Sequence, residues 1–111
     1  MAGEWPDRSD TKAWDALANY AMQSEMLEVD QAENDEWMDT MRSLVAEGLD
    51  YETFTARRME ALKARLTRRK REQTNLRYKY GLKHRRSDLV RMDVKRHLRA
   101  RSDGSNVRHP Q

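Results

Sequence analysis

The spacing of hydrophobic residues along the chain predicts helices. Apolar side chains recur every three or four positions, which gathers them on one face of an α-helix. No stretch alternates apolar and polar residues long enough to indicate a strand. Four helices are expected, over residues 11–29, 33–47, 51–74 and 87–101. Their apolar faces are marked by Trp14, Leu17, Ala18 and Ala21 in the first, Trp37, Met38, Met41 and Leu44 in the second, Tyr51, Phe54, Leu62 and Leu66 in the third, and Leu89, Val90, Val94 and Leu98 in the fourth.

Polar residues and glycines predict where the first three helices begin and end. Asp10 or Thr11 is a candidate cap for the first helix, because a short polar side chain can accept a hydrogen bond from the first helical turn. The polar run at residues 30–34 is expected to form a turn that separates the first helix from the second. Gly48 suits the position after a helix, and Asp50 suits the cap of the next one.

The chain after residue 74 has two alternative interpretations. Residues 74–86 are compatible with a continued helix or with a loop bent at Gly81. Ser87 is then expected to cap the fourth helix. Residues 1–10 are predicted to form a polar arm, and residues 102–111 a flexible tail.

These elements predict an all-α fold: a small bundle of three to four helices with a long basic third helix and flexible polar termini. The helical part, residues 11–101, is expected to be a single domain, acidic over 11–56 and basic over 57–101. Its core should be thin, because only 37% of the 111 residues are hydrophobic and another 37% are charged.

Composition bounds the chemistry and the location. Without cysteine, the chain has no disulfide, no thiolate metal site and no cysteine nucleophile. The first residues do not resemble a signal peptide, and no apolar run is long enough to span a bilayer. We therefore expect a soluble, cytoplasmic protein.

The net charge of +3 conceals a strong asymmetry between the two halves of the chain. Residues 1–56 carry 14 Asp and Glu against 3 Lys and Arg, whereas residues 57–111 carry 5 against 19. Such a split is typical of a polyanion-binding region next to an acidic one. Two alternatives stay open: the halves neutralise each other in the fold, or both are ordinary solvated surface.

The basic half contains a dense run of cations with tyrosines among them, and nucleic acid (DNA or RNA) is the leading partner. Arginine matches phosphates and base edges with paired hydrogen bonds, and tyrosine can stack on unpaired bases. The expected nucleic-acid-binding residues are Arg65, Arg68, Arg69, Lys70, Arg71, Arg77, Tyr78, Lys79, Tyr80, Lys83, Arg85 and Arg86. The alternative is a solvated helix face with the two tyrosines packed in the core.

Catalysis is not expected. The serines lie in no nucleophile motif, there is no phosphate-binding glycine loop, and the three histidines do not have metal-ligand spacing. We expect no catalytic residue, no metal and no cofactor.

The function expected from the sequence is that of a non-enzymatic nucleic-acid-binding accessory protein of the phage or mobile-element type. One alternative is a protein-interaction module, an inhibitor or adaptor of a nucleic-acid machine, with Trp5, Glu28, Asp35 and Asp39 as its contact residues. Another is a structural subunit of a larger particle. A homo-oligomer is compatible with each of these functions.

Overall fold

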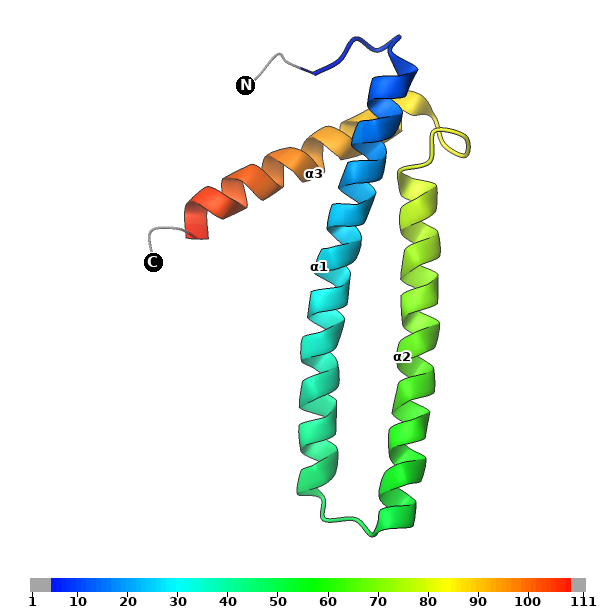
Figure 1. Ribbon diagram of the computed structural model, residues 1–111, viewed down its shortest axis with the longest axis vertical. Helices are drawn as coiled ribbons and strands as arrows, with labels where there is room; N and C mark the ends of the chain where they lie inside the picture. The colour runs from blue at the N-terminus through cyan, green and yellow to red at the C-terminus, as the bar shows by residue number, and fades with distance from the viewer. Residues whose placement is uncertain (1–4, 109–111) are drawn as a thin grey trace. The chain divides into compact units, whose positions relative to one another are not determined.

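The computed structural model describes residues 5–108, with side chains described for residues 5–102, and this part of the chain is helical without strands (Figure 1). It contains α1 (Thr11–Ala46), α2 (Tyr51–Lys79) and α3 (Ser87–Arg108). The expected all-α class is confirmed, with three helices in the described part of the chain. None of these helices is both long enough and apolar enough to cross a membrane.

The predicted break at residues 30–34 is wrong, because α1 runs through it as one helix of 36 residues. Neither glycine nor proline interrupts this stretch, and Asp30 is held by an ion pair to Arg69 at 3.0 Å. The turn-like composition of the segment therefore reflects acidic side chains that pair with the neighbouring helix.

The expected long basic third helix is not confirmed, because the third helix, α3, is the shortest at 22 residues. The basic segment that begins at Tyr51 is instead the second helix, α2, and it ends at Lys79 rather than near residue 74.

The expected caps at the first two helix starts are present. Asp10 Oδ1 accepts a hydrogen bond from the Ala13 N–H at 3.2 Å. Asp50 Oδ2 accepts one from the Thr53 N–H at 3.4 Å. Both contacts satisfy N–H groups of a first helical turn. Gly48 has a φ of 66°, the left-handed conformation that favours glycine after a helix end.

The start of α3 differs by one residue from the prediction. The Arg86 carbonyl accepts hydrogen bonds from the N–H groups of Leu89 and Val90, so Ser87 is the first helical residue rather than the cap. Before it, the chain leaves α2 at Lys79 and turns around Gly81, whose carbonyl accepts from the N–H groups of His84 and Arg85. Both alternatives for residues 74–86 are therefore partly realised, a longer helix followed by a turn.

The chain folds into two compact units. Of the described residues, 5–25 and 76–108 belong to unit 1, and Met26–Asn75 form unit 2. The single domain expected over residues 11–101 stays a prediction. Since α3 extends to Arg108, residues 102–108 of the expected tail are helical, while residues 1–4 and 109–111 of the arm and tail lie outside the described residues.

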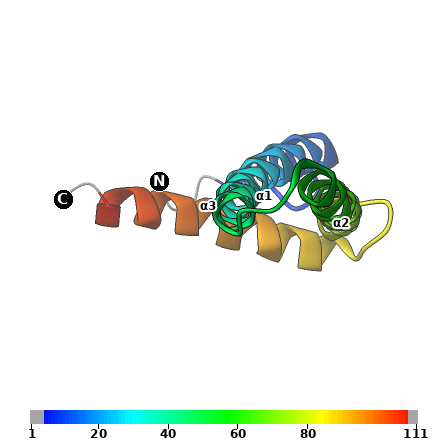
Figure 2. The ribbon, with the colours of Figure 1, turned by 90° about the horizontal axis from the view of Figure 1, so that it is seen from below.

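Unit 1 contains most of the buried apolar side chains. Its α3 crosses the first part of α1 instead of running alongside it (Figures 1 and 2). The core residues are Trp14, Ala18, Ala21, Leu76, Tyr80, Val90 and Val94.

Unit 2 is an antiparallel hairpin in which parts of α1 and α2 lie side by side (Figure 2). Among its described residues only Leu44 and Glu33 are buried, so its interior is thin and partly charged.

Candidate nucleic-acid interface

The two units divide the charge differently from the two halves of the sequence. Unit 2 carries 9 Lys and Arg against 11 Asp and Glu, a net charge of −2. Unit 1, counted over residues 1–25 and 76–111, carries 13 against 8, a net charge of +5. Folding α1 back along α2 neutralises the most basic run of the sequence, so the surplus of positive charge belongs to unit 1.

The neutralisation in unit 2 is specific. Glu33 is buried, and its carboxylate lies close to three arginines of α2. Its Oε1 atom is 3.9 Å from Arg65 Nε and 3.8 Å from Arg69 Nε, and its Oε2 atom is 3.8 Å from Arg68 Nε. Arg68 also lies 3.8 Å from Glu36. These three arginines, expected to contact phosphates, face carboxylates of the same hairpin.

These ion pairs join α1 to α2 mainly through electrostatic attraction, because few of the contacts are hydrogen bonds. Glu33 Oε1, Arg65 Nε and Arg69 Nε are buried without a hydrogen-bond partner among the described atoms. Arg65 also lies over the Trp37 ring, 5.2 Å from its centroid, where the face of the ring attracts a cation. Arg65 and Arg69 are thus held inside the hairpin.

Lys70 and Arg71 have a different environment. Both are exposed, line a shallow groove with Thr67, Thr74 and Asn75, and have no ion pair with a described carboxylate. They are the only two expected phosphate contacts in unit 2 that the described carboxylates leave uncompensated.

Four of the expected residues in unit 1 are occupied within the fold. Lys79 lies 3.3 Å from Glu25, and the Tyr80 hydroxyl, buried in the core, donates to Glu25 Oε1 at 2.6 Å. Arg85 donates to Asp93 at 2.6 Å and to the Lys79 carbonyl at 2.9 Å. Arg86 pairs with Asp88 at 2.9 Å, although its side chain is mostly exposed.

The other expected residues of unit 1 are accessible. Arg77 and Lys83 are exposed, and no described carboxylate pairs with them. Tyr78 is exposed and stacks on the exposed His84 ring, with centroids 6.5 Å apart and an interplanar angle of 13°. These residues place two cations and an accessible aromatic pair near the turn that precedes α3.

A row of cations on α3 was missed in the sequence. Arg91, Lys95 and Arg99 follow each other at intervals of four residues, and no described carboxylate pairs with them. Arg91 lies 6.0 Å and Lys95 5.8 Å from the Trp14 centroid. We call these three residues the α3 cation row. Their spacing was visible in the sequence, but the denser run at residues 65–71 drew the prediction.

Trp5 packs against the last two residues of the α3 cation row. It stacks on Trp14 with centroids 6.0 Å apart and an interplanar angle of 15°. Lys95 and Arg99 lie 5.9 Å and 6.0 Å from its centroid. The aromatic pair fixes where these cations lie without supplying a negative charge.

The residues expected for protein binding are divided between the two units. Trp5, half-buried in unit 1, packs on Trp14 as described. Glu28, Asp35 and Asp39 are exposed along α1 in unit 2, and Asp39 pairs with Arg42 at 2.7 Å. Their role in protein binding stays a prediction.

One polar cluster of unit 1 has the residue types of a hydrolytic triad. Ser24 Oγ lies 3.3 Å from His97 Nε2. His97 Nδ1 lies 3.8 Å from Glu25 Oε1, which is beyond hydrogen-bond distance. The buried Ser24 hydroxyl also accepts from Arg101 at 2.5 Å. With its oxygen occupied by a guanidinium and enclosed between helices, this cluster stabilises the packing of α3 on α1.

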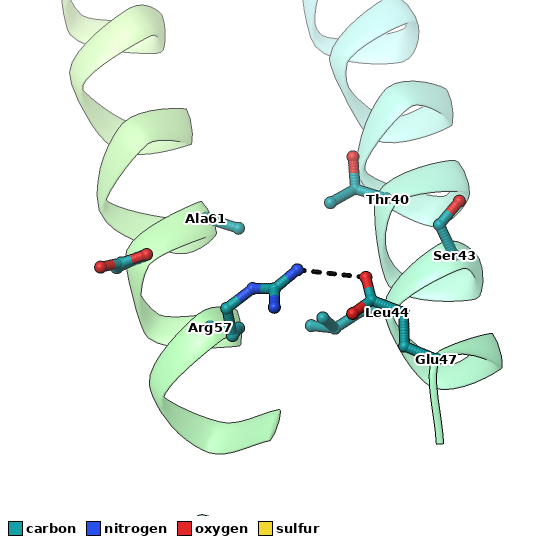
Figure 3. A pocket seen from close by; sticks show the side chains of 7 residues that line it. Thr40, Ser43, Leu44, Glu47, Arg57 and Ala61 are labelled. Atoms are coloured by element: carbon teal, nitrogen blue, oxygen red, sulfur yellow. Dashed lines mark hydrogen bonds and ion pairs between the residues drawn. The ribbon is translucent and has the colours of Figure 1, made fainter. Parts of the chain in front are cut away.

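A pocket lies between the helices of unit 2 (Figure 3). It is lined by Thr40, Ser43, Leu44, Glu47, Arg57, Glu60 and Ala61. Arg57 points across it and pairs with Glu47 at 3.1 Å. Within the described part of the chain, no group of three or more His, Asp or Glu side chains is placed to hold a metal ion.

Compared with known proteins, the chain matches no protein-family model, no curated protein and no solved structure. The assignment of function therefore depends on the geometry and charge of the described residues.

Proposed function

We propose that the protein is a non-enzymatic nucleic-acid-binding accessory protein, and that it contacts phosphates through unit 1. The α3 cation row, Arg91, Lys95 and Arg99, carries this proposal. Three cations follow one another along one helix without a carboxylate partner among the described residues, in the unit that carries a charge of +5. A polyanion supplies the missing negative charge, and counterion release favours the complex.

Two further features of unit 1 support a nucleic acid over a smaller anion. Arg77 and Lys83 add uncompensated cations from outside α3, which extends the number of phosphates that can be contacted. The exposed Tyr78–His84 stack offers an aromatic surface to an unpaired base.

The proposal shifts the binding surface relative to the expectation from sequence. Arg65, Arg68 and Arg69 would have to leave Glu33 to reach a phosphate, and that would strand a buried carboxylate. Lys70 and Arg71 remain accessible but belong to a unit with a net negative charge, so they are secondary contacts.

A salt titration with a matched pair of variants tests the proposal. The test variant is Lys95→Gln with Arg99→Gln. The control is Arg58→Gln with Lys63→Gln, which removes the same charge from exposed positions of unit 2 that pair with no described carboxylate and are not expected phosphate contacts. Fluorescence anisotropy with labelled single-stranded and duplex oligonucleotides measures affinity from low to high salt.

The test variant should weaken binding and lower the slope of log K against log salt by up to about 2, since each duplex phosphate contact contributes roughly 0.9. The control should retain nearly all of the wild-type slope. No binding at low salt, or an equal loss in the two variants, contradicts the proposal. Circular dichroism of both variants establishes that they are folded.

The finer parts of the proposal follow from the same reasoning. A small helical protein that contacts phosphates without catalytic groups fits the accessory proteins of phages and mobile elements, which work in the cytoplasm of the host. Whether the preferred partner is DNA or RNA is an outcome of the same titration, performed with both.

A further inference from the structure

Unit 2 exposes apolar side chains that its own hairpin does not cover. Leu27, Met38 and Val45 on α1, and Met59 and Leu66 on α2, are between 45% and 64% exposed. Residues 27, 38 and 45 are separated by nearly whole numbers of helical turns, as are residues 59 and 66. Each set therefore forms a stripe along one side of its helix.

The ion pairs of the hairpin show that both stripes lie on the same face. Glu36 pairs with Arg68, and Glu47 with Arg57, across one face of unit 2. An α-helix turns by about 100° per residue, so the stripe of α1 lies roughly a quarter turn around the helix from the buried Leu44. Glu36 and Glu47 lie on the opposite side of Leu44. The stripe of α2 lies on the side of its helix away from Arg57 and Arg68. We call the surface formed by Leu27, Met38, Val45, Met59 and Leu66 the apolar face.

A hairpin that buries only Leu44 and Glu33 of its described residues gains little from its own packing, and helices in water depend on packing for most of their stability. Exposed apolar patches on small proteins commonly mark interfaces. The apolar face is therefore expected to be covered when the protein is assembled.

The charges at the edges of this face identify what covers it. The outer edge of α1 carries Asp35 and the Asp39–Arg42 ion pair, and the outer edge of α2 carries Lys63 and Lys70, with Glu52 near its start. Asp35, Lys63 and Lys70 are exposed without an ion pair to a described residue. Asp35 lies between Glu33 and Glu36, which both reach Arg68, so it is level with that arginine along the hairpin. Lys70 is two residues further, about 3 Å along the axis.

We propose that a second copy of this chain covers the apolar face, in a dimer with twofold symmetry whose axis runs parallel to the helices. This operation places α1 of one copy against α2 of the other, antiparallel, and keeps each residue at its own level. Asp35 of each copy then meets Lys70 of the other. The result is a four-helix arrangement in which Asp35 on the outer edge of each α1 faces Lys70 on the outer edge of α2 in the other copy.

The alternative twofold axis, perpendicular to the helices, stacks α1 on α1 and α2 on α2. It brings the two α2 edges together, and with them the unpaired Lys63 and Lys70 of both copies, which costs energy through repulsion of like charges. Charge complementarity thus selects both the occupant and its orientation. The inference concerns unit 2 alone and does not depend on nucleic-acid binding by unit 1.

The first test is the oligomeric state of the full chain. Analytical ultracentrifugation across on the order of a hundredfold range of concentration should show a monomer–dimer equilibrium. Met38→Glu should weaken dimerisation on the order of tenfold or more, because it buries a charge in an apolar interface. Met92→Glu is the matched control, since Met92 is 51% exposed on α3 in unit 1, and it should leave the equilibrium unchanged.

The second test addresses the orientation. Asp35→Lys and Lys70→Asp should each weaken the dimer by placing like charges opposite one another. Mixing the two variants should restore it, because each copy then offers the charge that the other lacks. A monomer at every concentration, or a dimer unaffected by Met38→Glu, overturns the proposal. Failure of the mixture to recover overturns the proposed orientation.

Discussion

The Tyr80 hydroxyl donates a hydrogen bond to Glu25 at 2.6 Å, and this contact joins the end of α2 to α1 within unit 1. Glu25 also pairs with Lys79 and lies 3.8 Å from His97 of α3. One carboxylate of α1 thus receives groups from two other segments of the chain, residues 79–80 and α3. The tyrosine expected to stack on bases contributes to the stability of the fold instead.

Tyr80→Phe should destabilise the protein because Glu25 loses a hydrogen bond. The loss should be about 1.5 kcal/mol, the low end of the range for a hydrogen bond to a charged group, since part of Glu25 remains exposed. Urea denaturation followed by circular dichroism measures the change. Tyr78→Phe is the matched control, since the exposed Tyr78 side chain stacks on His84 and its hydroxyl has no hydrogen-bond partner among the described residues. Equal losses in the two variants would contradict this role of Tyr80.

Much of the secondary structure could be predicted from local signals. The caps at Asp10 and Asp50 and the left-handed Gly48 act through contacts within a few residues, so their effect is visible in the sequence. The break expected at residues 30–34 was wrong for a nonlocal reason. The acids there resemble a turn only when the arginines of α2, which lie far along the chain, are left out of account.

The candidate site was predictable to a smaller extent for the same reason. Charge density pointed to residues 65–71, but whether a cation is available depends on which carboxylate the fold brings beside it. Arg69 acquires Glu33 as a neighbour, whereas Arg77 acquires no described carboxylate. The α3 cation row has a lower density of charge along the sequence. What makes it the stronger candidate is its packing against Trp5 and Trp14, which only the fold brings beside it.

Removing the buried carboxylate of unit 2 should loosen that unit specifically. Glu33→Ala leaves Arg65 partly buried without its charge partner, and leaves Arg69 with Asp30 alone. The loss should approach but not reach the about 3–5 kcal/mol of a fully buried pair, since Arg68 can turn to solvent. Amide hydrogen exchange should show faster exchange within residues 26–75. Glu36→Ala, at an exposed position of the same cluster, should cost less than about 1 kcal/mol. A larger effect at Glu36 would reverse the assignment.

The cap of α2 gives a defined pH dependence. Hydrogen bonds from the Thr53 side chain and then from its backbone N–H lower the pKa of Asp50 below its ordinary value of 3.8. Its folded pKa is therefore lower than its unfolded pKa. The stabilisation from this cap is fully present when the pH is above the ordinary pKa of 3.8. It is lost as the pH falls from that value toward the lower pKa of the folded state.

Asp50→Asn isolates this contribution, because asparagine also caps a helix but does not titrate. The difference in urea midpoint between wild type and variant should stay constant above roughly pH 5 and then change in favour of the variant at lower pH. Other carboxylates titrate in both proteins and cancel in the comparison. A difference that is independent of pH down to strongly acidic conditions would rule out the lowered pKa.

The turns at Gly48 and Gly81 depend on glycine for different physical reasons, and substitutions at the two positions can distinguish these reasons. At Gly48 a Cβ atom would meet nothing within 4 Å, so Gly48→Ala is opposed only by the φ of 66°. The substitution should cost about 1 kcal/mol. Asparagine tolerates this conformation, so Gly48→Asn should cost less than Gly48→Ala.

At Gly81 the obstacle is steric. A Cβ atom there would lie 2.7 Å from the Arg77 carbonyl oxygen and 3.1 Å from the His84 ring, and a backbone carbonyl cannot move aside as a flexible side chain can. Gly81→Ala should therefore destabilise the protein more than Gly48→Ala does, and Gly81→Asn should give no recovery because it adds the same Cβ. Urea denaturation of the four variants provides the comparison. Recovery by asparagine at residue 81 would show that this turn, too, depends on backbone conformation rather than on the close approach of the Arg77 carbonyl.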